Sequence, residues 1–367
     1  MKIALLGDIA LFGRMAISNN GDWKSYYSKV KDLLKDSDYI IGNLESPFSV
    51  RKKTGGAKSA YLFSEVNNIE ILRYLNIKAV TLANNHMFDY GTEGYETTKQ
   101  VLSDNGIEWF GSEGKSLIIE HGGNKLACEG FCCYSSNPLR CCEYGGYGVN
   151  EYNIEKVISI VEHYKDAGYL PVLSVHAGIE HVNYPSTDTI KCAHLLASKT
   201  PIIYYGHHPH VVQGIEEYSG SLIAYSLGNF CFDDVYSSVS TKPLVELSEN
   251  NRSSCILFVE VEDNIITSWY TVPIYIGRTE LQVGKGITVE LLNQYSDALS
   301  RYLNDDYTQL RNSLIKEYIS SRKQKRNIIW YLKRLQPRYL QILLNAKKNK
   351  ASYDHCVKSY MNRYSIC

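Results

Sequence analysis

Residues 201–213, Pro-Ile-Ile-Tyr-Tyr-Gly-His-His-Pro-His-Val-Val-Gln, join an apolar run to three histidines. Residues 201–205 have the β-branched and aromatic composition of a buried strand, and Gly206 follows it. Pro209 stiffens the backbone between His208 and His210. Three imidazoles at one strand end are costly to place without a ligand. The stretch therefore predicts a strand that ends in a metal site.

Four other predicted strands also end in polar side chains that can bind metals. They carry Asp8; Asn43 and Glu45; Asn84, Asn85 and His86; and His176. Functional groups of such sheets lie just past the carboxyl ends of the strands, where neighbouring ends converge. Carboxylates mixed with imidazoles and an amide suit Mn, Fe or Zn better than calcium. Such an ion activates water and binds a phosphoryl or carbonyl oxygen.

Each of these residues also has a purely structural explanation when it is taken alone. Asp8 could cap a helix or form a turn, and Asn84 or Asn85 could favour a left-handed turn. His176 could be a half-buried histidine with a hydrogen-bond partner. Five such ends in one α/β sheet are harder to explain in this way, and we favour the metal site.

The hydrophobic pattern alternates strands with helices along most of the chain. Strands are predicted at 2–7, 39–41, 79–82, 107–110, 117–120, 125–133, 171–176, 201–205, 222–226, 255–262 and 265–276. Helices are predicted at 23–35, 67–76, 93–105, 153–167 and 187–199, and from about 287 to the end with a break near Pro337. This order predicts an α/β fold with two sheets packed face to face and helices outside.

Six blocks occur in order over residues 1–280. They are Gly7-Asp8, 42–47 (Gly-Asn-Leu-Glu-Ser-Pro), 83–91 (Ala-Asn-Asn-His-Met-Phe-Asp-Tyr-Gly), 175–180 (Val-His-Ala-Gly-Ile-Glu), 206–213 and 225–230 (Tyr-Ser-Leu-Gly-Asn-Phe). Together they resemble the poly-gamma-glutamate capsule-synthesis family, the CapA-like proteins, which in turn resemble calcineurin-like metallophosphoesterases. The resemblance implies a four-layer α/β/β/α sandwich of metallophosphoesterase type over residues 1–282. A basic helical C-terminal extension, 283–367, would follow as an appendage.

The resemblance also implies a role for each matching residue. The metal ligands would be Asp8, Glu45 or Asn43, Asn85, His176, His208 and His210. We favour Glu45 over Asn43 as the bridging ligand, because a neutral amide offsets the charge of two cations poorly. His86 would be the general acid at the leaving group, oriented by Asp89. The candidates for substrate binding are Lys58, Glu180, His207 and Asn229.

Two positions bear further on the chemistry. Metallophosphoesterases carry Asp-x-His after the first strand, and here the third position is Ala10. CapA-like proteins resemble this sequence in lacking that histidine. The number of metal ions, one or two, is therefore left open. The basic loop Arg51-Lys52-Lys53, with Lys58, is either a solvated loop or a clamp for carboxylates or phosphates.

The net charge of zero hides an asymmetry between the body of the chain and its tail. Residues 311–367 hold 14 Lys and Arg but only 2 Asp and Glu. The tail could be a packed or solvated helix pair, an interfacial helix on a membrane surface, or a docking element for a partner of a synthesis complex. Since no nucleic-acid motif accompanies it and the body is acidic, no nucleic-acid partner is expected.

Cysteine usage and the N-terminus indicate a compartment. The cluster Cys128, Cys132, Cys133, Cys141 and Cys142 lacks paired C-x-x-C spacing, so buried or loop thiols are favoured over a zinc site. The apolar run after Met1 is too short for a signal peptide. No run of 18 apolar residues predicts a transmembrane helix. The expected place is the cytoplasm, or the inner face of the membrane through the tail.

Two functions are compatible with these observations. One is a bacterial metal-dependent hydrolase, phosphoesterase-like or cleaving an amide or ester, that acts on an anionic cell-surface polymer or its precursor. The other is a non-catalytic, metal-containing accessory or binding component of a capsular polymer or polysaccharide synthesis or export complex. Ala10 and the basic tail favour the second.

Overall fold

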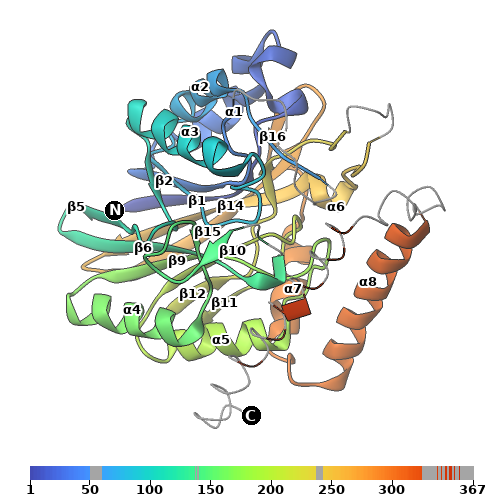
Figure 1. The fold of residues 1–367 in the computed structure, drawn as a ribbon. Coiled ribbons are helices and arrows are strands. Elements are labelled where there is room, and N and C mark those ends of the chain that lie inside the picture. The colour runs from blue at the N-terminus through green and yellow to red at the C-terminus, as the bar shows by residue number, and fades with distance from the viewer. Residues whose placement is uncertain are drawn as a thin grey trace.

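The computed structural model describes residues 1–49, 60–136, 138, 140–236 and 243–324, with isolated positions between 337 and 355. Figure 1 shows four layers, with helices above and below two stacked sheets. This confirms the predicted α/β/β/α sandwich with a helical C-terminal portion. The basic loop with Lys58, and the tail beyond residue 324 apart from those isolated positions, lie outside the described residues.

The first sheet has eight strands among the described residues. Its order is β16 (Leu281–Val283), β15 (Ile265–Ile276), β14 (Ser253–Glu262), β1 (Lys2–Ile9), β2 (Tyr39–Leu44), β3 (Ala79–Thr81) and β4 (Glu108–Phe110), with β13 (Asn229–Cys231) beside β1. Strands β1 to β4 are parallel, and the β14–β15 hairpin is antiparallel. Its outer face carries α1 (Trp23–Leu34), α2 (Ile69–Tyr74) and α3 (Gly91–Asp104).

The second sheet has the order β11 (Ile215–Tyr218), β12 (Ser221–Ala224), β10 (Ile203–His207), β9 (Leu170–His176), β6 (Asn124–Cys132) and β5 (Leu117–His121). Helices α4 (Ile154–Asp166) and α5 (Thr187–Ala197) cover its outer face. The short strands β7 (Cys141–Cys142) and β8 (Val149–Asn150) pair apart from it. Three further helices follow: α6 (Glu249–Arg252), α7 (Val289–Leu299) and α8 (Asp305–Gln324).

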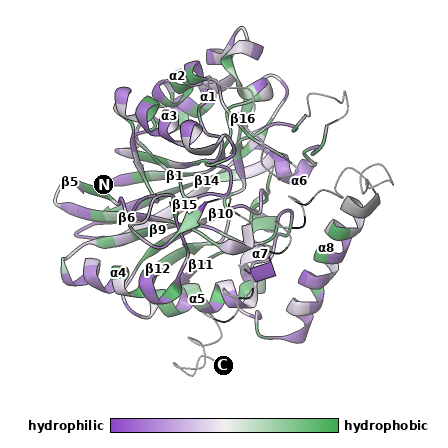
Figure 2. Cartoon of the chain, viewed as in Figure 1, coloured by the Kyte–Doolittle hydropathy of each residue, from purple (hydrophilic) through white to green (hydrophobic). Residues whose placement is uncertain are grey.

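Strand β1 explains why the chain begins with an unbroken apolar run. Ile3 and Leu5 join the core between the two sheets, whereas Ala4 and Leu6 join the core under α1 and α2. Successive side chains of a strand point to opposite faces, so a strand buried on both faces needs apolar residues throughout. Figure 2 accordingly shows largely hydrophobic strands between helices of mixed hydropathy.

Two glycines allow one backbone segment to cross the ends of strands from both sheets. A Cβ atom at Gly7 would lie 2.0 Å from the Gly228 carbonyl oxygen, and one at Gly206 would lie 1.9 Å from that of Tyr225. The amide of Asp8 donates to the Gly228 carbonyl at 3.0 Å. Any larger residue would push segment 225–228 away, so Gly7 and Gly206 permit this close approach.

Several boundaries differ from the sequence prediction. The predicted strand 201–205 is β10, which continues to His207 because its ladder with β9 extends to the pair His207–His176. The long C-terminal helix is interrupted at 300–304, between α7 and α8. Short strands such as β11, β13 and β16 were not predicted, because runs of three or four residues are too short for a periodic pattern.

The C-terminal portion packs against the second sheet. Leu292, Tyr295, Leu299 and Tyr307 belong to the same buried cluster as the strands of that sheet. A domain boundary at residues 282 and 283 remains a prediction. Every helix within the described ranges is too short or too polar to span a bilayer.

Candidate metal centre

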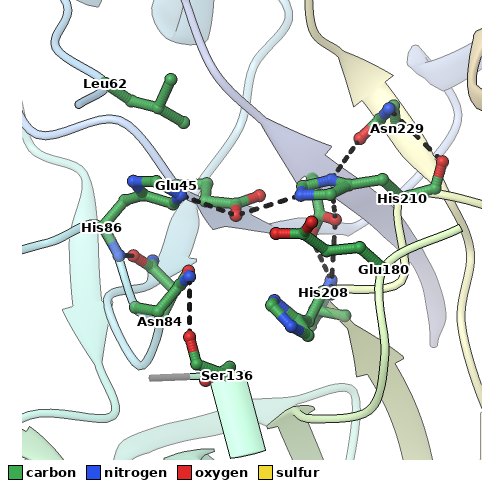
Figure 3. A network of polar contacts seen from close by, with 12 residues as sticks. Glu45, Leu62, Asn84, His86, Ser136, Glu180, His208, His210 and Asn229 are labelled. Carbon is green, nitrogen blue, oxygen red and sulfur yellow. Dashed lines mark hydrogen bonds and ion pairs between the residues drawn. The ribbon is translucent and has the colours of Figure 1, made fainter. Parts of the chain in front are cut away.

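The candidate centre lies where strand ends of the two sheets meet. The first sheet contributes Asp8, Asn43 and Glu45 from the ends of β1 and β2, and the turn after β3 adds Asn84, Asn85 and His86. The second sheet contributes His176 and His207 from the ends of β9 and β10, followed by His208 and His210. The structure thus brings the five predicted strand ends together (Figure 3).

Asp8 is the most heavily contacted carboxylate of the centre and is fully buried. Its Oδ1 accepts a hydrogen bond from Asn43 Nδ2 at 2.8 Å and lies 3.1 Å from His207 Nδ1. Its Oδ2 lies 3.2 Å from His210 Nδ1 and accepts from the amide of His208 at 3.4 Å. Asp8 therefore links the first sheet to residues 207–210 of the second, which we call the histidine loop.

Glu45 is the second fully buried carboxylate, and three imidazoles surround it. Its Oε1 lies 3.6 Å from His210 Nε2, 3.9 Å from His176 Nε2 and 4.0 Å from His86 Nε2. One ligand atom from each of Asp8, Glu45 and His210 lies within 4.8 Å of the other two. This is the spacing of a compact three-ligand metal site.

Asparagine amides connect the remaining groups. Asn84 Nδ2 donates to Asn43 Oδ1 at 3.0 Å, and Asn43 Nδ2 also lies 3.4 Å from His176 Nδ1. Asn85 Nδ2 donates to the Ser136 carbonyl at 3.0 Å, while its Oδ1 lies 3.0 Å from His176 Nε2. Asn43 and Asn85 thus orient neighbouring side chains, and their predicted role as metal ligands stays a prediction.

His86 and Asp89 form the predicted acid pair. His86 Nδ1 lies 2.6 Å from Asp89 Oδ2, which also accepts from the amide of Leu62 at 2.8 Å. Such a carboxylate fixes the ring orientation and leaves Nε2 for other contacts. The geometry has the form that the sequence predicted, whereas catalysis by this pair remains a prediction.

The predicted substrate-binding residues lie in different surroundings. The Glu180 carboxylate points toward the space between Glu45 and His208 (Figure 3). His207 is buried against Asp8, and Asn229 Oδ1 lies 2.8 Å from His210 Nδ1. His207 and Asn229 therefore support other groups of the centre, which leaves Glu180 as the candidate that faces its interior.

The histidine loop has strained backbone. His208 has φ of 94° and His210 has φ of 56°, which are left-handed values that non-glycine residues rarely adopt. Such conformations cost roughly 1–3 kcal/mol each and cluster at functional sites. Pro209 between them supports the sequence argument for a stiff loop.

Charge is distributed unequally among the buried groups. Burial alone would raise the pKa of Asp8, but hydrogen bonds and charge from His207 and His210 hold it well below its ordinary range. Burial lowers the pKa of His210, yet Glu45 and Asp8 outweigh this and raise it to about 10. Burial, with neighbouring imidazoles, lowers the pKa of His176 well below its ordinary value and that of His208 to about 4.

These groups fit a divalent transition metal. Two fully buried carboxylates need positive charge nearby, and His176 and His208 favour the neutral form in which imidazole binds metals. Among the described residues, His207 Nε2 and His208 Nδ1 are buried without a hydrogen-bond partner. A mixed set of carboxylates and imidazoles suits Mn, Fe or Zn, as the sequence predicted. The identity of the metal and the number of ions stay proposals.

Sequence reasoning missed several residues that support the centre. Asn251 Nδ2 donates to the His210 carbonyl at 3.0 Å, and its backbone carbonyl accepts from Asn229 Nδ2 at 3.0 Å. The backbone carbonyl of Ser136 accepts a hydrogen bond from the side-chain amide of Asn85. Neither lies at the end of a predicted strand or in one of the six blocks, so no pattern in the sequence selects them. Cys128, Cys132, Cys141 and Cys142 of the predicted cysteine cluster are free thiols.

Fold and site together define a two-sheet α/β protein with a buried carboxylate–imidazole centre of metal-binding type. The family model for the bacterial capsule synthesis protein PGA_cap matches residues 2–234, and the chain belongs to this family. PGA biosynthesis protein CapA of Bacillus subtilis (strain 168) is 29% identical over 256 residues, covering 67% of each chain. Capsule biosynthesis protein CapA of Bacillus anthracis is 28% identical over 273 residues, covering 71% of this chain and 66% of the relative.

The match spans about two thirds of the length of each of these relatives. Among solved structures, the NAD nucleotidase NadN of Haemophilus influenzae is similar with a TM-score of 0.43 and 17% identity. That similarity covers 88% of this chain and 67% of the other. The family membership confirms the CapA-like resemblance that the six blocks predicted.

Proposed function

We propose that this protein is a metal-dependent hydrolase of capsule synthesis, acting on a phosphoester, or on an amide or ester bond, of an anionic surface polymer or its precursor. The observation that carries the proposal is the buried set of Asp8, Glu45 and His210, whose ligand atoms lie within 4.8 Å of one another. The relatives named for capsule biosynthesis support the polymer as the substrate class.

Asp8, Glu45 and His210 would hold the metal, with His176 and His208 as further imidazole donors. A bound divalent ion supplies Lewis acidity at a phosphoryl or carbonyl oxygen and lowers the pKa of water. His86 would donate a proton from Nε2 to the leaving group, while Asp89 holds the ring through Nδ1. Burial excludes bulk water from these groups and strengthens their mutual electrostatic interaction.

Elemental analysis of the purified protein, combined with a panel of phosphodiester and gamma-glutamyl substrates, tests the proposal. We expect stoichiometric Mn, Fe or Zn and turnover of at least one substrate class. His208→Ala should reduce turnover, and His121→Ala serves as a control because His121 is an exposed histidine far from the centre in the sheet. Absence of bound transition metal together with full activity of His208→Ala would exclude this function.

A second function is favoured by Ala10, which stands where metallophosphoesterases have a histidine. In this alternative, the centre binds carboxylates of the polymer within a synthesis or export complex and cleaves nothing. Turnover of any substrate that Asp8→Asn abolishes would rule it out.

We further propose that the protein works in the cytoplasm or at the inner membrane face, with the basic residues of 311–367 contacting an anionic surface or complex partner. Cosedimentation with anionic vesicles tests the membrane contact.

A further inference from the structure

Helix α8, at the right in Figure 1, lies outside residues 2–234 that the family model matches, yet it contacts the loop after β9. Tyr307 OH donates to the Pro185 carbonyl at 2.8 Å, and Arg311 Nε donates to the Tyr184 carbonyl at 3.2 Å. Further along the helix, Tyr318 OH donates to Glu180 Oε2. These three residues of α8, spaced four and seven positions apart, therefore attach the helix to one loop.

The carboxylate that Tyr318 contacts is the one that faces the centre. Glu180 lies between His208 and His210 in Figure 3, with its carboxylate directed at the space in front of Glu45. Its negative charge also favours the protonated forms of both histidines. The phenol of Tyr318 thus holds an anionic oxygen beside the candidate metal ligands.

The neighbouring residue, His181, provides a second connection. The Tyr318 and His181 rings are stacked, with centroids 5.2 Å apart and planes at 28°. The amide of His181 donates to the Pro209 carbonyl at 2.7 Å, and its Nδ1 lies 3.0 Å from Asn251 Oδ1. Asn251 in turn donates to the His210 carbonyl. Tyr318 therefore contacts two residues that reach the histidine loop by separate routes.

We propose that Tyr318 is a positioning residue that holds the Glu180 carboxylate at the metal centre, so that the C-terminal helix completes the site. The inference rests on the proposed metal site, because Glu180 acts here as an added anionic oxygen for a divalent ion. A hydroxyl that donates to a carboxylate fixes its position and direction. Such supporting contacts typically change metal affinity by about 10–100-fold.

Binding of Mn²⁺ to the full-length protein, measured by isothermal titration after chelator treatment, tests the proposal. We expect Glu180→Gln to weaken Mn²⁺ binding about 10–100-fold, and Tyr318→Phe to weaken it about 3–10-fold, because the carboxylate remains but is no longer fixed. The double variant should bind no more weakly than Glu180→Gln, since Tyr318 acts through Glu180. Tyr307→Phe is the matched control: it removes a hydroxyl from the same helix and should leave Mn²⁺ affinity unchanged.

Equal Mn²⁺ affinity of Tyr318→Phe and wild type would overturn the proposal. So would an equal loss from Tyr318→Phe in the wild-type and Glu180→Gln backgrounds, because the phenol would then act independently of Glu180. If the expected pattern of affinities appears but no substrate is turned over, the hydrolase function fails and the positioning role stands. A wild-type protein that binds none of Mn²⁺, Fe²⁺ and Zn²⁺ would overturn both.

Discussion

Asp8 and Glu129 are both fully buried carboxyl groups, but their surroundings shift their pKa values in opposite directions. Asp8, at the end of β1, faces His207 and His210, and its pKa lies well below the ordinary range. Glu129, within β6, accepts hydrogen bonds only from the phenols of Tyr164 at 2.7 Å and Tyr144 at 3.0 Å among the described residues. Burial raises the pKa of Glu129 to about 7, against the opposing effect of these phenols.

The difference shows that burial alone does not determine the charge of a carboxyl group in this protein. Hydrogen bonds and charge from neighbouring imidazoles preserve the negative charge of Asp8, whereas the phenol hydrogen-bond donors only partly preserve that of Glu129. A negative carboxylate among imidazoles suits a metal ion, while a carboxyl that titrates near pH 7 affects mainly the pH dependence of stability.

The largest effect is expected from neutralising Asp8. Asp8→Asn keeps the shape of the side chain but removes the charge that two imidazoles face, so Mn²⁺ affinity should fall by at least about 100-fold, the upper end of the range for supporting residues. Isothermal titration measures this. Glu129→Gln, which neutralises the other buried carboxyl, is the control and should bind Mn²⁺ as wild type does. If Asp8→Asn bound Mn²⁺ as tightly as wild type, the charge of Asp8 would not distinguish it from Glu129 in metal binding.

The next effect concerns the charge of His210 in the metal-free protein. Its pKa of about 10 exceeds that of an unfolded histidine, so its stabilisation is complete below about pH 6.5 and lost as pH rises through about 10. Wild type should therefore lose on the order of several kcal/mol relative to His210→Gln across this window. Urea unfolding of chelator-treated protein measures the free energy of unfolding of wild type and of His210→Gln at each pH. Titration of the tyrosines contributes equally to both proteins and cancels in the difference.

Saturating Mn²⁺ should remove this dependence, because metal binding requires the neutral imidazole and releases its proton. A parallel pH profile for wild type and His210→Gln in the metal-free state would show that His210 carries no extra proton between Asp8 and Glu45.

A smaller loss of stability with rising pH is expected from Glu129. The folded protein retains a proton on Glu129 up to about pH 7, whereas the unfolded chain loses it near pH 4.3. Stability should thus fall between these values, by on the order of 3 kcal/mol. Glu129→Gln should remove this fall, as measured by urea unfolding at pH 5 and pH 8. Unchanged pH dependence in the variant would mean that Glu129 ionises normally.

The smallest effect concerns one phenol. Tyr144→Phe removes a hydrogen bond to the Glu129 carboxylate and should cost about 1–2 kcal/mol at pH 8. Tyr169→Phe is a matched control, because its hydroxyl donates at 2.8 Å to the solvent-exposed Glu120. Thermal unfolding should show a smaller loss for the control. Equal losses would show that burial adds nothing to the bond with Glu129.

The sequence predicted those parts of the molecule that depend on local pattern. Apolar runs such as 171–176 are strands, and the polar residues after them, including Asp8 and His210, converge because parallel strands end at one edge. The Tyr318–Glu180 contact could not be predicted, since 138 positions separate the two residues and no periodicity links them. The hydrogen bonds of the Asn251 amide could not be predicted either, because a hydrogen-bond network depends on side-chain directions that only the packed structure fixes.

Segment 225–228 lies against both Gly7 and Gly206, so main-chain contacts join the end of β1 to the end of β10, beside the side-chain contacts of Asp8. The spacing between the acidic strand ends and the histidine strand ends is therefore fixed partly by main-chain contact. We expect a spacing held in this way to adjust little to the size of a bound ion. We expect it to discriminate between cations by ionic radius, preferring an ion with bonds near 2 Å over the larger calcium ion. Gly7→Ala, whose added methyl would push segment 225–228 away from β1, should relax that preference.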